Sequence, residues 1–466
     1  MSDAFDAWWL PAGTGDAGFR TLRVGDLACR YPEPTPSLID SAVDLLREAG
    51  RELAERPVDR IIDPIDRVAR RLADPTDPLR EDAERLLTAA TGYHPAMTRL
   101  VLDRMSADWR AEPLRRLLRA ELGDPAAIDG FTADDEGRRR RAYGPRLAFH
   151  VFAGNVPGVA VTSLVRSLLV KGPSLGKLAS DQPVLPVLFA RAVRDEDPAL
   201  ARTMAITYWP GGAAAAEDLA LRAADTVIVY GGAEPARSVR ERTPGHTRLV
   251  FHGPRLSVGL IGAEALGSID ATADRAARAT AAFDQHGCVS PHTFWVEAGG
   301  DGEDTTAPLA FAEALAQALE RLEDELPRGR ISAAEASAIQ QERGAAEFRG
   351  HGGAGVRVLA DEGTRWTDVF DPDTAFRPSC LNRVVHVHPV ANLEDAADLL
   401  APLGDSLQSV AVEADAPRRA HIAHRLARAG ATRITSLSRL PWPPPQWHHD
   451  GRGPLTELIR WVDLED

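Results

Sequence analysis

The sequence predicts an α/β protein in which a helical N-terminal region precedes two units of alternating strands and helices. Residues 35–122 carry apolar side chains at helical spacing. From residue 146 onward, short apolar strands alternate with helices, the pattern of βαβ units around a parallel sheet. The expected parts are a mainly helical region (1–140), a Rossmann-type domain (141–250), an α/β domain (251–435) and a C-terminal segment (436–466) that returns to the Rossmann-type domain or to an oligomer interface.

The first part begins with an irregular or partly β segment at residues 1–34. Thr35 and Pro36 then offer an N-cap and a proline in the first helical turn. The expected helices of this part are 37–57, 78–92 and 112–123. The run Arg138–Arg141 is interpreted as a solvated connection to the next part.

The Rossmann-type part alternates strictly between strand and helix, although it has no G-x-G-x-x-G pattern. The expected strands are 146–154, 174–179, 204–212 and 225–232, and the expected helices are 162–172, 185–197, 213–224 and 234–243. This spacing indicates right-handed βαβ crossovers.

The third part repeats the alternation. The expected strands are 247–253, 256–262, 293–300, 356–360, 383–390 and 409–414, and the expected helices are 270–287, 309–325 and 417–430. The tail from residue 439 is rich in Pro, Trp and His, and we expect it to be irregular at first and then helical.

Composition narrows the function classes. The chain has 466 residues, 44% hydrophobic and 26% charged, which is ordinary for a soluble globular protein. With 54 basic and 68 acidic residues the formal charge is −14, which argues against a nucleic-acid partner. The most apolar stretch, 151–170, is too broken to span a membrane, and no signal peptide is evident.

Three cysteines, at 29, 288 and 380, are too few and too widely spaced for a disulfide framework or a zinc pattern. They favour a reducing cytoplasm. Cys288 follows a long helix and a glycine, so it could be a nucleophile on a tight turn, where the thiolate is the reactive form. The alternative, a buried cysteine that acts as a small apolar residue, is assigned to Cys29 and Cys380.

Three further segments follow strands. Asn155, between a strand and a helix, could donate to an oxyanion, or it could form an Asx-turn or a helix cap. Lys177 could bind a ribose or a phosphate, or it could be a surface lysine. Gly231 and Gly232 would let a pyrophosphate approach a helix N-terminus, although many α/β proteins have such a turn.

The histidines are less specific. His252 and His286 could act as acid–base groups, and each could equally be structural. The pairs His386/His388 and His448/His449 do not have the spacing of metal ligands, so no metal is expected.

Taken together, these segments resemble the aldehyde dehydrogenase superfamily, and within it the LuxC-like acyl-CoA reductases of bacterial luminescence. The resemblance covers residues 149 to the C-terminus, through the segments 153–183, 283–297 and 440–455. Asn155 precedes Cys288 by 133 residues and Lys177 precedes it by 111, separations close to those in the superfamily. The resemblance implies an aldehyde-dehydrogenase-like fold, with Asn155 and Cys288 as catalytic residues and Lys177, Gly231 and Gly232 as cofactor-binding residues.

Two departures refine this implication. Hydrolytic aldehyde dehydrogenases carry a glutamate base where this chain has Phe251 and His252. Transfer to a thiol is therefore expected instead of hydrolysis, with His252 exchanging the proton of the leaving thiol. Ser180 stands where NAD-preferring members often have glutamate, so we expect NADPH as the cofactor, with NADH as the alternative.

The resemblance implies reduction of an acyl thioester, on coenzyme A or acyl carrier protein, to a fatty aldehyde through a thioacyl-cysteine. An acylating aldehyde dehydrogenase that works in the oxidative direction and a noncatalytic scaffold subunit are the alternatives. The expected assembly is a homodimer or homotetramer, and the expected location is cytoplasmic.

Overall fold

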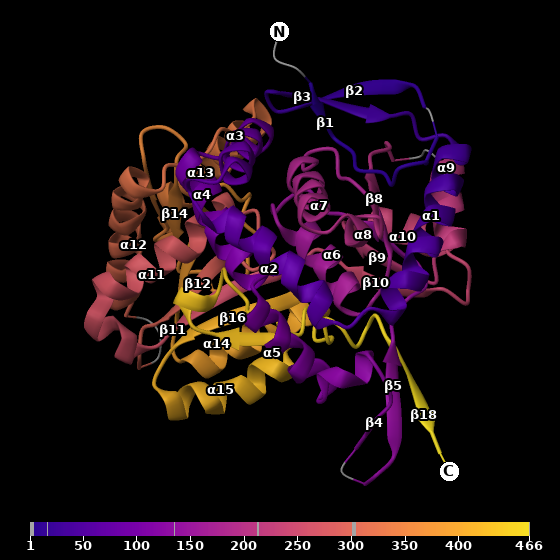
Figure 1. Cartoon of the computed structure of the whole chain (residues 1–466). Helices are drawn as coiled ribbons and strands as arrows, with labels where there is room; N and C mark the ends of the chain where they lie inside the picture. The colour runs from indigo at the N-terminus through magenta and orange to yellow at the C-terminus, as the bar shows by residue number, and fades with distance from the viewer. Residues whose placement is uncertain (1–3, 16, 135, 212–213, 301–303, 466) are drawn as a thin grey trace. The chain divides into compact units, whose positions relative to one another are not determined.

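The computed structural model describes residues 4–465 apart from 16, 135, 212–213 and 301–303 (Figure 1). Its contacts divide the chain into two compact units. Unit 1 comprises the residues up to Gly92, Thr98–Gly253 and the residues from Pro444. Unit 2 comprises Tyr93–Met97 and Pro254–Pro443.

A parallel sheet of five strands, in the order β10-β9-β6-β7-β8, forms the centre of unit 1. The strands are β6 (Ala148–Val151), β7 (Ser174–Lys177), β8 (Met204–Thr207), β9 (Thr226–Tyr230) and β10 (Arg248–His252). The helices that follow them are α6 (Val159–Leu169), α7 (Val184–Glu196), α8 (Pro198–Ala201), α9 (Ala214–Ala223) and α10 (Ala233–Arg242). Every residue of β9 is buried, as expected for a parallel sheet covered on both faces.

The N-terminal part of the chain supplies helices α1 (Pro36–Glu55), α2 (Asp59–Ala73), α3 (Pro78–Thr91), α4 (Pro95–Asp108) and α5 (Ala111–Leu122), a 3-10 turn (Pro125–Ile128) and strands β1 (Phe5–Asp6), β2 (Phe19–Val24) and β3 (Leu27–Pro32). The Thr35 hydroxyl accepts the Leu38 N–H at 3.2 Å, which confirms the predicted N-cap. A second small sheet has the order β18-β5-β4 and consists of β4 (Thr132–Ala133), β5 (Arg139–Tyr143) and β18 (Arg460–Leu464). In Figure 1, β5 and β18 run side by side.

Unit 2 is built on a seven-stranded sheet with the order β13-β14-β15-β12-β11-β16-β17. The strands are β11 (Leu256–Ile261), β12 (Pro291–Glu297), β13 (Arg357–Ala360), β14 (Thr367–Phe370), β15 (Val384–Val390), β16 (Leu407–Glu413) and β17 (Arg433–Thr435). The helices are α11 (Ile269–Ala281), α12 (Thr306–Glu325), α13 (Ala333–Arg349), α14 (Leu393–Leu399) and α15 (Ala416–Arg428), with short turns η2 (Ala263–Ser268), η3 (Ala282–Gln285), η4 (Gly350–Ala354), η5 (Ala401–Ser406) and η6 (Leu437–Arg439). All strand pairs are parallel except β13 with β14.

The predicted α/β class is confirmed, and each predicted strand of the two α/β parts overlaps an observed one. Residue 213, the predicted first position of one helix, lies outside the described residues. Two local predictions were wrong: Arg138–Arg141, expected to be a connection, contributes to β5, and the end of the tail, expected to be helical, forms β18. These two strands pair with each other across more than 300 positions, and β5 also pairs with β4.

Candidate membrane spans were sought among the helices of the described residues. None of these helices combines the length and the apolar character needed to cross a bilayer.

Candidate active site

The turn that carries Cys288 lies between α11 and β12 in unit 2. Three consecutive residues of this turn, Phe283–Gln285, adopt the left-handed region, with φ of 57°, 48° and 70°. A non-glycine residue there is strained by roughly 1 kcal/mol or more, because its Cβ crowds the backbone. The neighbouring contacts must therefore hold the turn in place, while the Cys288 side chain remains partly exposed.

A second left-handed run, Leu381–Arg383, binds the first one. Arg383 Nη2 donates to Asp284 Oδ1 at 2.7 Å. The Gln285 side chain accepts the Val384 N–H at 2.9 Å and donates to the Val384 carbonyl at 2.7 Å. These contacts are buried, so the two strained runs fix each other and set the position of the cysteine that follows.

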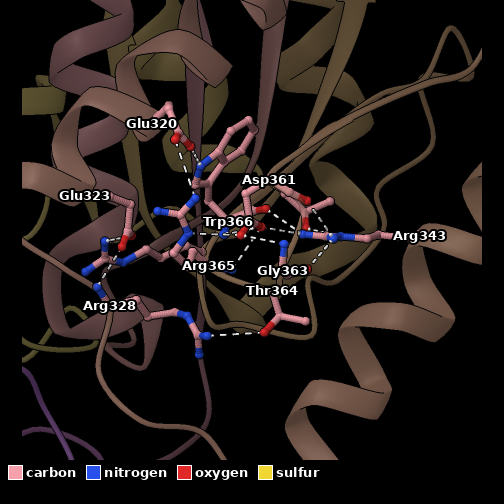
Figure 2. A network of polar contacts seen from close by, with 11 residues as sticks. Glu320, Glu323, Arg328, Arg343, Asp361, Gly363, Thr364, Arg365 and Trp366 are labelled. Carbon is pink, nitrogen blue, oxygen red and sulfur yellow. Dashed lines mark hydrogen bonds and ion pairs between the residues drawn. The ribbon is translucent and has the colours of Figure 1, made fainter.

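The same arginine connects the turn to α12, because Arg383 Nη1 donates to Glu323 Oε1 at 2.6 Å. Figure 2 shows Glu323 at the edge of a larger network that braces the loop between β13 and β14. In that loop Asp361 accepts hydrogen bonds from Arg343 and Arg365, each at 3.0 Å. Burial alone would raise the pKa of Asp361, but the bonds from Arg365 and Arg343 outweigh it and lower the pKa. These paired charges have a structural role.

Ser257 on β11 contacts the Cys288 backbone, and Arg433 on β17 interacts with Cys288 electrostatically. Ser257 Oγ donates to the Cys288 carbonyl at 2.8 Å and accepts the Ser409 N–H at 3.2 Å. Ser409 lies opposite Arg433 in the β16–β17 pair. Burial lowers the pKa of Arg433 to about 10, and the negative charge of a Cys288 thiolate opposes this shift. The interaction is reciprocal, so the Arg433 cation favours the thiolate form of Cys288.

The other two cysteines have different surroundings. Burial raises the pKa of Cys29 and of Cys380 to about 11. Both are therefore protonated thiols at neutral pH, and a thiol is a poor nucleophile.

The candidate residues of unit 1 gather at the carboxyl ends of adjacent parallel strands. Asn155 follows β6, Lys177 ends β7 and Gly231 follows β9, and β6 lies between β7 and β9. Ligands of open α/β sheets bind at this edge. Asn155 is exposed, and Gly158 is the N-cap of α6, so Asn155 does not cap that helix.

Lys177 is already paired with a carboxylate. Its Nζ lies 2.9 Å from Glu217 Oε1, and Glu217 Oε2 accepts Arg242 Nη1 at 2.8 Å. Burial would raise the pKa of Glu217, but the two cations outweigh it, so Glu217 remains a carboxylate. Ser180, also predicted to face the cofactor, is exposed three residues after Lys177.

Gly231 and Gly232 connect β9 to α10. The Gly231 N–H donates to the His252 carbonyl at 3.1 Å, and Gly232 is the N-cap of α10, with no side-chain cap hydrogen bond. The Gly231 N–H is thus occupied, but no N-cap side chain occupies the N–H groups of the first turn of α10, and an anion can bind at such a helix N-terminus. Together with the side chains of Asn155 and Lys177, this edge fits a dinucleotide cofactor.

His252, at the end of β10, forms a hydrogen bond with an acidic residue of the C-terminal segment. Its Nδ1 lies 2.8 Å from Asp450 Oδ2, and the Asp450 side chain is 1% exposed. The imidazole stacks with both Tyr230 and His449, with ring centroids 4.7 Å and 4.3 Å away, and the centroids of those two rings are 6.4 Å apart. An ionised carboxylate can only accept, so Nδ1 carries the proton and Nε2 is left able to accept one.

His252, His449 and Asp450 also place one potential metal-ligand atom each within 4.8 Å of one another. The two imidazole planes are only 13° apart. Their nitrogen lone pairs therefore run side by side, which does not suit a shared metal ion.

The predicted site residues thus divide between the units: Cys288 belongs to unit 2, and Asn155, Lys177, Ser180, Gly231, Gly232 and His252 belong to unit 1. Sequence reasoning missed Asp450, Glu217, Ser257 and Arg433. The His-His-Asp run at 448–450 was a visible signal for Asp450, but its partner lies 198 positions away.

In sequence, the chain is similar to known proteins over most of its length. A family model described as acyl-CoA reductase (LuxC) matches residues 53–461. The long-chain acyl-protein thioester reductase of Aliivibrio fischeri is 28% identical over 396 residues, 82% of this chain and 77% of the relative. The protein of the same name from Photobacterium phosphoreum is 25% identical, over 82% and 75% of the two chains.

Solved structures share the fold. Aldehyde dehydrogenase 21 of Physcomitrella patens superposes with a TM-score of 0.78 at 14% identity, over 100% of this chain and 98% of that one. A NAD-dependent benzaldehyde dehydrogenase of Corynebacterium glutamicum gives 0.74 at 17% identity, over 99% of each chain. The predicted aldehyde-dehydrogenase-like fold is therefore confirmed.

Proposed function

This chain belongs to the LuxC family of acyl-CoA reductases, and on that premise we propose that it reduces an acyl thioester to the aldehyde. The observation that carries the proposal is the turn of Cys288. The left-handed runs Phe283–Gln285 and Leu381–Arg383 hold this turn in place, and Arg433 favours the thiolate form of Cys288. A thiolate is both a strong nucleophile and a good leaving group, as this chemistry requires.

The Cys288 thiolate attacks the thioester carbonyl and forms a C–S bond. Asn155 and a backbone N–H stabilise the oxyanion, worth ~2.7–4 kcal/mol per donor in comparable enzymes. The bond to the carrier thiol breaks, and the departing sulfur takes a proton that His252 Nε2 has first accepted from solvent. A nicotinamide cofactor, when bound, would supply the hydride for the thioacyl carbon. The resulting thiohemiacetal anion on Cys288 collapses, which releases the aldehyde and returns Cys288 to its thiolate.

Asp450 supports His252 in this scheme. It holds the Nδ1 proton, so that Nε2 is the nitrogen that exchanges a proton with the thiol. The sequence has no carboxylate at positions 251–252, and Asp450 supplies one to His252 from the C-terminal segment.

We assign the cofactor to the edge formed by Lys177, Ser180, Gly231 and Gly232, and NADPH is the preferred form because Ser180 brings no charge against a 2′-phosphate. Coenzyme A or an acyl carrier protein presents the acyl group, and the active form is a homodimer or homotetramer.

The test uses the enzyme with a panel of acyl-CoA thioesters. Without cofactor, mass spectrometry should find the acyl group on Cys288. With NADPH, aldehyde and free thiol should appear in equal amounts. Cys288→Ser should abolish turnover, while Cys380→Ser, the matched control, should retain it. Full turnover by Cys288→Ser would reject the covalent mechanism.

Two variants test the supporting residues. Asn155→Ala should slow acylation by about 10²–10³-fold. Asp450→Asn should lower turnover, because the His252 tautomer is no longer fixed. An unaltered acylation rate or an unaltered turnover would remove the corresponding residue from the mechanism.

A further inference from the structure

A basic cavity of about 930 Å³ lies in unit 1, apart from the residues assigned to the cofactor. Seven arginines and one lysine line it, against Glu55 and Asp225 as the acidic lining residues. The chain as a whole carries a charge of −14, so such a concentration of positive charge is a local feature. Burying or crowding like charges is unfavourable unless an opposite charge is present.

The cavity lies at the opposite edge of the central sheet from the proposed cofactor residues. Its walls include Leu147, Pro173 and Thr226, which precede or begin strands β6, β7 and β9. Lys177 and Gly231 stand at the other ends of these strands. Strands of four or five residues separate the two edges by roughly 13–16 Å. The basic cavity is therefore distinct from the proposed cofactor site.

Two of the lining arginines share one aromatic ring. The guanidinium carbons of Arg141 and Arg460 lie 4.7 Å and 4.9 Å from the Tyr143 ring centroid. Arg141 Nε is buried and has no hydrogen-bond partner among the described residues. A buried donor without an acceptor is unfavourable, and Arg141 as a whole is only partly buried, so an anion can reach its guanidinium group.

The acidic residues near the cavity neutralise only part of the positive charge of its lining residues. Asp225 lies 3.3 Å from Arg146, whose side chain is 91% exposed, and Lys171 pairs with Asp129 at 2.7 Å. Arg47 and Arg248 donate to backbone carbonyls, which carry no full charge. Most of the positive charge is thus left for a ligand.

We propose that this cavity binds a small molecule that carries two or more phosphate groups. Guanidinium groups pair with phosphate oxygens in a bidentate manner, and Tyr143 offers a flat surface between two of them. The volume is within the range of small-molecule sites, whereas a protein partner would need a broader, flatter surface. The ligand is either an inorganic polyphosphate anion or the phosphorylated end of a nucleotide.

Isothermal titration of the full-length protein with inorganic pyrophosphate, 3′,5′-ADP and coenzyme A tests the proposal and separates the two sources. Saturable binding is expected, and it should weaken as salt rises. Arg141→Gln combined with Arg460→Gln should weaken binding about tenfold or more, since each lost charge-assisted bond contributes substantially. Arg222→Gln, an exposed lining residue, provides a second variant that should fold normally.

The matched control is Arg85→Gln, which removes the same charge from an exposed helix position in unit 1 and should leave binding unchanged. Lys177→Gln, at the opposite edge of the sheet, should leave pyrophosphate binding unchanged. The proposal is overturned if no probe binds saturably, if Arg85→Gln weakens binding equally, or if Lys177→Gln abolishes pyrophosphate binding while the lining variants retain it. Sedimentation gives a further outcome: if the lining variants change self-association and not anion binding, a second copy covers the cavity and the proposal is wrong.

Discussion

Replacing Arg383 with Met removes the cation that joins the nucleophile turn to α12. The Arg383 side chain is 0% exposed, and its two carboxylate partners, Asp284 and Glu323, are 5% and 6% exposed. The substitution approximately preserves the volume of the aliphatic stem. Its main effect is therefore to leave two buried carboxylates without their shared counter-ion, and we expect a large loss of stability.

Two lines of reasoning give the magnitude. Removing one partner of a buried ion pair generally costs about 3–5 kcal/mol. Alternatively, one carboxyl becomes protonated in the folded state, which costs about 4 kcal/mol at pH 7 for a group with an ordinary pKa near 4. In the variant the folded pKa lies above the unfolded one, so stability falls as pH rises between them. At about pH 5.5 the loss should shrink to roughly 2 kcal/mol.

The assay is urea unfolding near pH 7 and pH 5.5, followed by tryptophan fluorescence and by alkylation of Cys288. Arg321→Met is the matched control, because Arg321 forms an exposed pair with Asp274 at 3.5 Å that should contribute less than about 1 kcal/mol. Adding Asp284→Asn to the Arg383 variant should recover part of the loss. A loss no larger than that of the control, or one that is equal at both pH values, would refute the reasoning.

Three further substitutions give sharp expectations. Arg433→Met should slow alkylation of Cys288 near neutral pH several-fold, because the thiolate loses a nearby cation, and Arg433→Lys should restore part of the rate; an unchanged rate would exclude the electrostatic role. In a Cys288→Ser background, Glu217→Gln should shift the ratio of the NADPH and NADH dissociation constants towards NADPH by about tenfold, since Lys177 loses its carboxylate partner; fluorescence titration showing a constant ratio would contradict this. Burial raises the pKa of Asp368 well above its usual range, so the folded state retains a proton that the unfolded state loses above about pH 4, and stability falls as pH rises towards the folded pKa. Asp368→Asn should therefore gain stability over the wild type between about pH 5 and pH 8 in urea unfolding, and parallel curves would count against the assignment.

Periodicity was sufficient for the central strands of both units, because a buried parallel strand has a continuous apolar sequence that depends little on distant residues. β9, with the sequence TVIVY, is an example. The arginine-rich β5 gave no such signal. It is a strand because β4 and β18 supply its hydrogen bonds, and the pairing with β18, at that sequence distance, leaves no local pattern.

The candidate site shows the same division. Asn155, Lys177 and Gly231 could be proposed because each follows a predicted strand, and parallel strands bring their carboxyl ends to one edge. Glu217 and Asp450 lie within helical or irregular sequence, and nothing local indicates which cation or imidazole they contact. The left-handed turns at Phe283–Gln285 and Leu381–Arg383 could not be predicted either, because none of these six residues is a glycine, the residue type that usually indicates positive φ.

The chain order of the two units has a consequence for how the protein is made. Almost all of unit 2 is one continuous segment, Pro254–Pro443, inserted between the parts of unit 1. Domains form during synthesis as their residues emerge from the ribosome. Unit 2 can therefore complete its sheet while unit 1 still lacks β18 and the carboxylate of Asp450. Until residues 444–466 emerge, the edge of β5 that pairs with β18 stays open. The arginines of β5 repel the same strand of another copy, which disfavours edge-to-edge association during this interval.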